Sequence, residues 1–544
     1  MLITRAVRVA AALAALVVLL PGAARAATAP PLYTSPVKLT QDSTFGGYEP
    51  GLVVDRYGNI VVTAHKQNHG DAISPDTGAL PVRAQSWIWM SSDGGQTFPD
   101  MPGLTALGVD RLDFGDEGDV AVDNTGHIYF VDTKVADVSF TRWQATGPGA
   151  VTEQYTTPVL GSASPVDDRP WVIAHGDGVV QYLANEGDKL TYGNGRYTSY
   201  MSYDGGATFD HIGVTLPDSG WCRPIASHAA GSKLIVVVCT NDGGANDDNT
   251  LPCTPGFMTG TLWAYVSNDD GRSFTQHKVG SYNPCNPVDS WPAVAEDATG
   301  NLYALYLDAT TTGGPGPTGA IPGVGDPLST VAASSYHLNL FRSSDHGVTW
   351  SMRDVTPEKG VYHYSWLDVA PDGTIGVVFY HAKDANSDWF VDSEIIPPVT
   401  PLVSTSISLL RIAAVSPDKV STSQFGPMGD FFECMFGPDG RLNVVWTGLS
   451  TLAGNASTYG LNSDIFFART ASPVAHPVVA SAQPLPAAAP APAVAPTTTP
   501  PATGVQVGLV NTAGPQTGPG PALAALGLMV LTASLRRRRK ANRR

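Results

Sequence analysis

The chain is poor in charge, and its basic residues are outnumbered by its acidic ones. Of its 544 residues only 15% are charged, with 32 Lys and Arg against 48 Asp and Glu. Binding to nucleic acid needs clustered Lys and Arg, so this balance argues against nucleic acid as a partner. Gly (57) and Pro (44) are plentiful, which disfavours long helices and favours short strands joined by turns.

Several catalytic and metal-binding signatures are also missing. The sequence has no Gly-x-Ser-x-Gly elbow, no HExxH, no phosphate-binding loop with Gly-Lys-Ser/Thr and no dinucleotide fingerprint in a strand–helix context. It has five cysteines but no CxxC spacing, which argues against a zinc site. In an exported protein, Cys222, Cys239, Cys253 and Cys285 would form two disulfides, for which three pairings are possible. Cys434 would then remain as a buried thiol.

The first 26 residues have the pattern of a secretory signal. Arg5 and Arg8 precede an apolar run from Val9 to Leu20, and Ala24-Arg25-Ala26 completes a small-residue cleavage pattern. The alternative, an uncleaved membrane anchor, is disfavoured because the run is short for a membrane span. We therefore predict export.

The C-terminal end predicts retention at the cell surface. Residues 471–521 are rich in Pro, Ala and Thr and lack charge, which predicts an extended linker. Residues 522–544 join an apolar stretch to the basic run Arg536–Lys540. This end resembles a bacterial cell-wall sorting signal, whose Leu-Pro-x-Thr-Gly motif is matched by residues 514–518 with Gly in place of Leu. The resemblance implies attachment to the cell wall or membrane, and the alternative is a disordered tail.

Removal of both ends would leave a strongly acidic protein. The signal and the tail contain basic residues and no acids, so the remainder has a net charge of about −26. Such a surface favours solubility and attracts cations.

A repeated motif organises the middle of the chain. The pattern Ser-x-Asp-x-Gly-x-(Thr/Ser)-aromatic occurs four times, with its acids at Asp93, Asp204, Asp269 and Asp345. Ser and Asp side chains are expected to bond backbone N–H groups of a tight turn, Gly to adopt a positive φ, and the aromatic residue to pack into the core. The motif resembles the Asp box of the sialidase-like, or BNR-repeat, β-propellers, and the resemblance covers about 430 residues.

Paired apolar segments around Asp/Gly turns predict β-hairpins between the boxes. Seven such hairpins begin near Leu52, Val120, Trp171, Ile225, Ala293, Val369 and Met435. One hairpin plus a boxed hairpin makes a four-stranded blade, which predicts an all-β, seven-bladed propeller over residues 37–470. The six blades of sialidases remain the alternative. Val37–Leu39 is expected to close the ring on the last blade. In the three blades without a box, the third strand is expected at 140–143, 407–411 and 465–467.

Strand direction predicts where a ligand would bind. The Asp/Gly turns and the Asp boxes share one face of the disc, which we call the box face. The start of each innermost strand therefore lies on the opposite face, which we call the mouth face. Polar and aromatic residues at these starts are Glu49, Asp116, Glu117, Asp119, Asp167, Asp168, Arg169, Trp221, Arg223, Asp289, Trp291, Tyr364, Trp366, Asp368, Asp430 and Glu433. The second strands end on the same face at His65, Asp132, Asn185, Glu186, Asp242, Asp308 and His381.

Three roles fit this ring of side chains. The carboxylates could bond backbone N–H groups of a neighbouring blade, which would be a structural role. They could hold calcium, the cofactor that several carboxylates and carbonyls would suit. Alternatively, paired carboxylates could act on carbohydrate, with Trp221, Trp291 and Trp366 as platforms for sugar rings.

The resemblance to sialidases implies three arginines that grip a substrate carboxylate, a Tyr nucleophile activated by Glu, and an Asp acid/base. Here Glu49 stands where the first arginine is expected, in Tyr-Glu-Pro instead of Arg-Ile-Pro. Arg169 and Arg223 are the remaining candidates for the arginines, and Tyr364 or Tyr362 for the nucleophile. Because so acidic a mouth would repel an anionic substrate, sialidase activity is disfavoured.

We therefore expect an exported, envelope-attached propeller that recognises or hydrolyses carbohydrate. For a glycosidase, Asp168 and Asp289 are the predicted acid and base. The predicted substrate-binding residues are Glu49, Arg169, Trp221, Arg223, Trp291, Tyr364, Trp366 and Asp368. The competing prediction is a non-catalytic adhesion or scaffold module that binds a protein or a glycan. Carboxyl groups about 5–9 Å apart across a cleft would favour hydrolysis, and carboxylates bonded to backbone would favour the scaffold.

Overall fold

A computed structural model describes most of the region between Tyr33 and His476. The described residues are 33–41, 45–68, 86–102, 117–134, 137–158, 167–186, 196–210, 212–229, 231–241, 260–282, 291–309, 336–384, 387–398, 409–415, 432–449 and 463–476. All of them belong to one compact unit of the chain. The predicted signal segment and C-terminal tail lie outside these residues.

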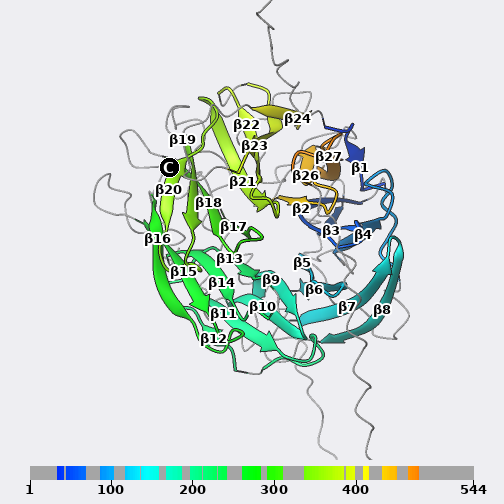
Figure 1. Ribbon diagram of the computed structural model, residues 1–544. Helices are drawn as coiled ribbons and strands as arrows, with labels where there is room; N and C mark the ends of the chain where they lie inside the picture. The colour runs from blue at the N-terminus through cyan, green and yellow to red at the C-terminus, as the bar shows by residue number, and fades with distance from the viewer. Residues whose placement is uncertain are drawn as a thin grey trace, which may run out of the picture. The chain divides into compact units, whose positions relative to one another are not determined.

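Seven antiparallel sheets follow one another as blades around a common axis (Figure 1). Blade 1 contains β2 (Phe45–Val54), β3 (Ile60–Asn68) and β4 (Trp87–Ser91). Blade 2 contains β5 (Glu117–Val122), β6 (His127–Lys134), β7 (Asp137–Gly147) and β8 (Ala150–Pro158). Blade 3 contains β9 (Asp167–Gly176), β10 (Val179–Glu186), β11 (Arg196–Ser202) and β12 (Val214–Thr215). Blade 4 contains β13 (Cys222–Ala226), β14 (Ile235–Thr240), β15 (Gly260–Ser267) and β16 (Thr275–Tyr282).

The remaining three blades complete the ring. Blade 5 contains β17 (Ala293–Glu296), β18 (Leu302–Ala309), β19 (Tyr336–Ser343) and β20 (Ser351–Asp354). Blade 6 contains β21 (Val361–Val369), β22 (Ile375–Ala382), β23 (Phe390–Ile396) and β24 (Leu410–Ala414). Blade 7 contains β25 (Glu433–Phe436), β26 (Leu442–Leu449), β27 (Ser463–Arg469) and the N-terminal β1 (Val37–Lys38). In the described part of the chain, no helix is long and apolar enough to span a membrane.

The ring is closed by the N-terminal strand. Val37 and Lys38 in β1 pair with Phe467 and Phe466 in β27, as the sequence predicts. The innermost strands β2, β5, β9, β13, β17, β21 and β25 contact one another in this order, and β25 contacts β2 again. The seven-bladed prediction is confirmed, and the six-bladed alternative is wrong.

Both ends of the propeller extend beyond the predicted boundaries of 37 and 470. Tyr33 forms a β-bridge with Thr470. Beyond it, the backbone N–H of Ala475 donates to Gly440 O, and Ala475 is buried. Backbone hydrogen bonds and apolar burial therefore continue into the first residues of the predicted linker.

One predicted strand of blade 6 is wrong. The third strand is β23 (Phe390–Ile396), and the residues predicted as the third strand overlap β24, which is the fourth. The third strand carries Asp392, Ser393 and Glu394 in its centre, all fully buried. These acidic residues interrupt the apolar pattern on which the prediction depended. The predicted third strands of blades 2 and 7 are confirmed as parts of β7 and β27.

Three of the four Asp boxes form turns between the third and fourth strands of their blades, and the first follows β4, the last strand of blade 1, before the isolated bridge between Trp89 and Asp100. In the last box, Ser343 Oγ accepts from Gly347 N at 2.9 Å, and Asp345 Oδ1 accepts from Thr349 N at 2.8 Å. Hydrogen bonds from Thr349 lower the pKa of Asp345 to about 2.

Each box also docks on the preceding blade through the glycine at the fifth position of the motif. A Cβ on Gly95, Gly206, Gly271 or Gly347 would lie 2.1, 1.9, 2.4 or 3.0 Å from a side chain of that blade. The side chains are Phe467, Phe140, Met201 and Val266, all in third strands. The boxes therefore hold neighbouring blades together as well as turning the chain.

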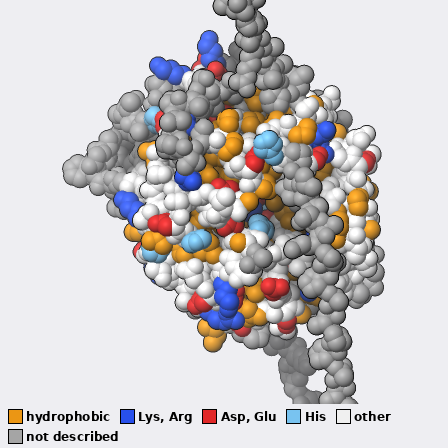
Figure 2. Space-filling view, in the orientation of Figure 1, with side chains coloured by type: hydrophobic (Ala, Val, Ile, Leu, Met, Phe, Trp, Pro, Cys, Tyr) orange, Lys and Arg blue, Asp and Glu red, His pale blue; other side chains and the backbone are white. Residues whose placement is uncertain are grey.

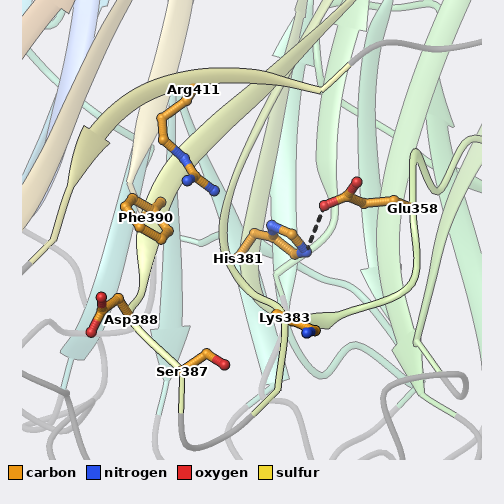
Figure 3. A pocket seen from close by; sticks show the side chains of 7 residues that line it. All are labelled: Glu358, His381, Lys383, Ser387, Asp388, Phe390 and Arg411. Atoms are coloured by element: carbon orange, nitrogen blue, oxygen red, sulfur yellow. Dashed lines mark ion pairs between the residues drawn. The ribbon is translucent and has the colours of Figure 1, made fainter.

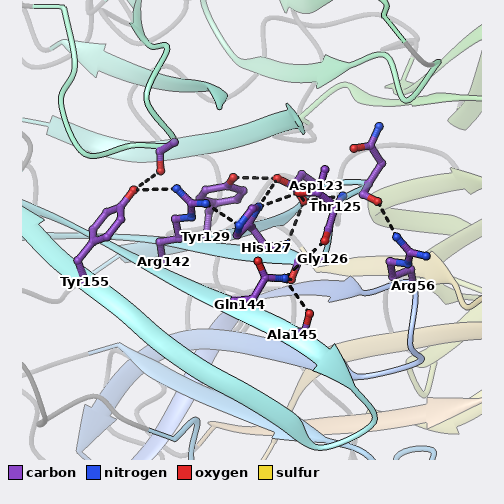
Figure 4. Close-up of polar contacts among 12 residues, drawn as sticks. Arg56, Asp123, Thr125, Gly126, His127, Tyr129, Arg142, Gln144, Ala145 and Tyr155 are labelled. Carbon is purple, nitrogen blue, oxygen red and sulfur yellow. Dashed lines mark hydrogen bonds and ion pairs between the residues drawn. The ribbon is translucent and has the colours of Figure 1, made fainter. Parts of the chain in front are cut away.

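Blade 2 has no Asp box, and a polar network occupies its box-face turn (Figure 4). Burial alone would raise the pKa of Asp123, but hydrogen bonds from His127 and Thr125 hold this pKa at about 2. Arg142 donates to His127 Nε2, so the proton of the neutral ring lies on Nδ1, facing Asp123. Tyr155 then donates to Gly205 O in the box of blade 3.

We predict that Gly206→Ala destabilises the propeller by about 2–5 kcal/mol. The substitution combines a left-handed backbone (φ 88°) with overlap against Phe140. Gly58→Ala is the matched control, because Gly58 has a similar φ of 81° but nothing within 4 Å of the added Cβ. Denaturant unfolding should show a loss of only about 1–2 kcal/mol for the control. Equal losses in the two variants would contradict the docking of the box.

Candidate functional site at the propeller axis

The mouth face is organised around Arg223 in β13. Its guanidinium packs against two neighbouring indole rings, 4.2 Å from the centroid of Trp171 and 4.8 Å from that of Trp366. Nη2 lies 3.0 Å from Glu433 Oε1, and Nη1 lies 3.5 Å from Asp119 Oδ2. The side chain is 14% exposed. Five innermost strands (β5, β9, β13, β21 and β25) thus supply one axial cluster, defined here as Asp119, Trp171, Arg223, Trp366, Asp368 and Glu433.

The three carboxylates of this cluster each bond the backbone of the next blade, at three of the seven steps around the ring. Asp119 accepts from Val172 N at 2.8 Å, which links blade 2 to blade 3. Asp368 accepts from Phe436 N at 2.6 Å, which links blade 6 to blade 7. Glu433 accepts from Leu52 N at 2.8 Å, which closes blade 7 on blade 1. These three carboxylates therefore make the bonds to backbone N–H groups of a neighbouring blade that define the predicted structural role.

The carboxylates of the cluster have raised pKa values because they are buried, and Arg223 offsets this only in part for Glu433 and Asp119. Burial raises the pKa of Glu433 to about 7, although Arg223 opposes the shift, and nearby Asp119 and Asp368 add to it. Burial also raises the pKa of Asp368 to about 6 and raises that of Asp119. On the face shown in Figure 2, acidic, basic and apolar side chains are interspersed.

The predicted tryptophan platforms differ in exposure. Trp291 is 2% exposed and packs against Trp171 and Trp221, with centroid distances of 5.3 and 4.6 Å. Trp366 is 5% exposed and covers Arg223. Trp221 is half-buried, so it is the one of the three that presents an open surface. Sequence position alone did not distinguish these rings, because the differences come from packing between blades.

Glu49 and Tyr364 occupy equivalent bulges in the innermost strands of blades 1 and 6. Both have left-handed backbones, with φ of 49° and 40°, and both are 3% exposed. Strain of this kind persists only where the surroundings enforce it. Glu49 lies 3.2 Å from His65 Nε2, so the position predicted for a substrate-gripping arginine holds a buried acid–histidine pair. Burial raises the pKa of Tyr362, the other tyrosine considered as a nucleophile.

The predicted catalytic pair is not placed by the structure. Asp289 lies outside the described residues, as do Asp116, Asp242 and Asp430. The backbone of Asp168 pairs with Asn185 at the start of β9, but its side chain and that of Arg169 are not described. Their roles remain predictions.

One predicted disulfide is present beside the axial cluster. Cys222 and Cys239 are bonded across β13 and β14, with a Cα–Cα distance of 4.1 Å. Cys253 and Cys285 lie outside the described residues, and Cys434 is a buried free thiol, as predicted. Among the described residues, no group of three or more His, Cys, Asp or Glu is arranged to hold a metal ion, so calcium stays a prediction.

Comparison with known proteins gives only distant similarities. No family model and no curated protein matches the chain. A protein of unknown function from Dyadobacter fermentans is 13% identical, with a TM-score of 0.41 over 80% of this chain and 98% of that one. The phage phi92 endosialidase is 12% identical, with a TM-score of 0.41 over 82% and 70%. The Penicillium chrysogenum α-L-arabinanase, complexed with arabinobiose, is 12% identical, with a TM-score of 0.38 over 81% and 98%. Similarities this distant carry no argument about activity, and the propeller assignment depends on the strand pairing above.

We predict that stability falls as the pH rises from about 4.5 to about 7. The folded-state pKa of Glu433 is about 7 against a usual value of 4.5, so the folded state holds a proton that the unfolded chain releases. The stabilisation is complete below pH 4.5 and is lost as the pH passes 7. Denaturant unfolding across this range should show that the free energy of unfolding falls less steeply with pH in Glu433→Gln than in the unsubstituted protein. Glu358→Gln, which alters an exposed carboxylate, is the control. If this pH dependence is unchanged in Glu433→Gln, the raised pKa of Glu433 is not its source.

Proposed function

We propose that this chain is an exported, cell-surface propeller that recognises carbohydrate at its mouth face and does not hydrolyse it at the axial cluster. The observation that carries the proposal is that the axial carboxylates are buried and already bonded within the protein. Asp119 and Glu433 are each 2% exposed and are bonded to both Arg223 and a neighbouring blade. Hydrolysis of a glycoside needs two carboxyl groups that face an open cleft. These carboxylates lack that freedom.

The groups left accessible at the axis suit recognition. Trp221 is half-buried, and the side chain of the adjacent Arg223 is 14% exposed. Both are rigid, because Trp221 packs on Trp291 and Arg223 is held by two rings and two carboxylates. A rigid aromatic face beside fixed hydrogen-bond donors is the arrangement that orients a sugar ring. The surrounding acids favour a neutral sugar over an anionic one.

Export and surface attachment are supported by the two ends of the chain. The signal pattern at residues 1–26 supports export, and the linker with the apolar and basic tail supports retention at the cell wall or membrane. In this arrangement the propeller is displayed outside the cell, where glycans and surface proteins are available as partners.

A glycoside hydrolase is the second candidate function. The observation that favours it is the contact between Trp171 and Trp291, whose ring centroids are 5.3 Å apart. Trp171 in β9 follows Asp168 closely in the chain, and Trp291, two residues before β17, follows Asp289. Asp168 and Asp289 would then act as acid and base.

We predict that the mature protein binds neutral oligosaccharides without releasing sugar, and that Trp221→Ala weakens binding at least about tenfold. Trp350→Ala is the matched control, because Trp350 is also half-buried but belongs to an Asp box on the opposite face. Calorimetric titration measures binding, and an assay for reducing ends measures release. Release that is abolished in Asp168→Asn or Asp289→Asn would establish the hydrolase instead. Equal loss of binding in both Trp variants would contradict an axial site.

A further inference from the structure

We propose that blade 6 carries a second ligand site, which takes one neutral sugar ring or a polyol of similar size. The site is a cavity of about 400 Å³ beside the outer strands of the blade (Figure 3). It is lined by Glu358, His381, Lys383, Ser387, Asp388, Phe390 and Arg411. It goes beyond the axial recognition proposed above, because none of its lining residues belongs to the axial cluster.

A buried aspartate fixes the histidine in this cavity. Asp392 is fully buried and accepts from Arg411 Nε at 3.1 Å and Arg411 Nη2 at 3.3 Å. Its Oδ2 also lies 3.1 Å from His381 Nδ1. Because a carboxylate only accepts, the proton of the neutral imidazole lies on Nδ1 and Nε2 is left with a free lone pair. The ring of Tyr362, at a centroid distance of 4.7 Å, packs against the imidazole.

The other nitrogen of His381 has no hydrogen-bond partner within the described residues. His381 is 2% exposed, and the closest carboxylate oxygen, Glu358 Oε1, is 3.8 Å from Nε2. A buried polar atom without a partner is costly, so a site that keeps one has a reason to do so. The backbone of Gly360 packs closely against this nitrogen, since a Cβ there would lie 2.1 Å from Nε2. A ligand hydroxyl would supply the missing donor.

The rest of the lining indicates the chemical class of the ligand. Glu358 and Asp388 are acceptors, Lys383 and Arg411 are donors, and Ser387 can do both. The face of Phe390 is covered by Arg411, whose guanidinium carbon is 3.3 Å from the ring centroid, so little apolar surface is left. A cavity of this size with alternating donors and acceptors suits a compact molecule with several hydroxyl groups.

The charges disfavour an ionised ligand. The two acidic and two basic side chains of the lining balance, and Asp392 behind them adds a negative charge. The acidic surface of the whole protein also repels anions. A neutral hexose or pentose is therefore favoured over a uronic acid.

The experiment uses the full mature protein and four probes: D-glucose, D-galactose, L-arabinose and D-glucuronate. Saturation-transfer NMR should detect at least one neutral sugar, with a dissociation constant of roughly millimolar size, and no glucuronate. Glu358→Gln and Lys383→Gln should each weaken that binding about tenfold, because each alters one group at the rim of the cavity. Both residues are exposed, so neither substitution threatens the fold. Lys359→Gln is the matched control, since Lys359 is exposed but does not line the cavity.

The result separates this site from the axial one. Binding that survives Trp221→Ala but falls in Glu358→Gln and Lys383→Gln supports the blade 6 site, even if the axial proposal fails. Binding that is lost in Trp221→Ala and unchanged in both rim variants overturns it. Preference for glucuronate, or no signal from any neutral sugar, also overturns it.

Discussion

The structure depends on one buried cation at the axis. A guanidinium keeps its charge at any ordinary pH, so Arg223 must be matched by anions wherever it is removed from water. Glu433 and Asp119 supply that match from blades 7 and 2, while the indole rings of Trp171 and Trp366 both pack against the guanidinium. The cluster thereby joins innermost strands that are far apart in the sequence, and it leaves the axis with few groups free for chemistry.

Polar contacts between blades extend this arrangement outward from the axis. Apolar side chains fill the space between sheets, as Phe140 and Phe209 do between blades 2 and 3. Directional bonds add to this packing: three axial carboxylates bond the backbone of the next blade, and the four Asp boxes dock on the preceding blade at the box face. Polar contacts thus join blades both near the axis and at the box face.

Local sequence patterns predicted the fold well because a propeller repeats local units. The Asp boxes, the hairpins and the closing β1 (Val37–Lys38) depend on turn chemistry and strand alternation that can be seen within a few residues. The third strand of blade 6 was missed because Asp392 is buried against Arg411 and His381, a partnership set by the tertiary structure. For the same reason the sequence located Arg223 but not its partners, and it could not distinguish the open Trp221 from the covered tryptophans.

The most direct test of the account is a double-mutant cycle on Arg223 and Glu433, followed by denaturant unfolding. If the pair holds the axis, Arg223→Met should cost about 3–5 kcal/mol, because it leaves buried carboxylates unmatched. Adding Glu433→Gln should recover a substantial part of that loss. A stable Arg223→Met protein, with losses that simply add in the double variant, would contradict the account and return the axial carboxylates to the list of catalytic candidates.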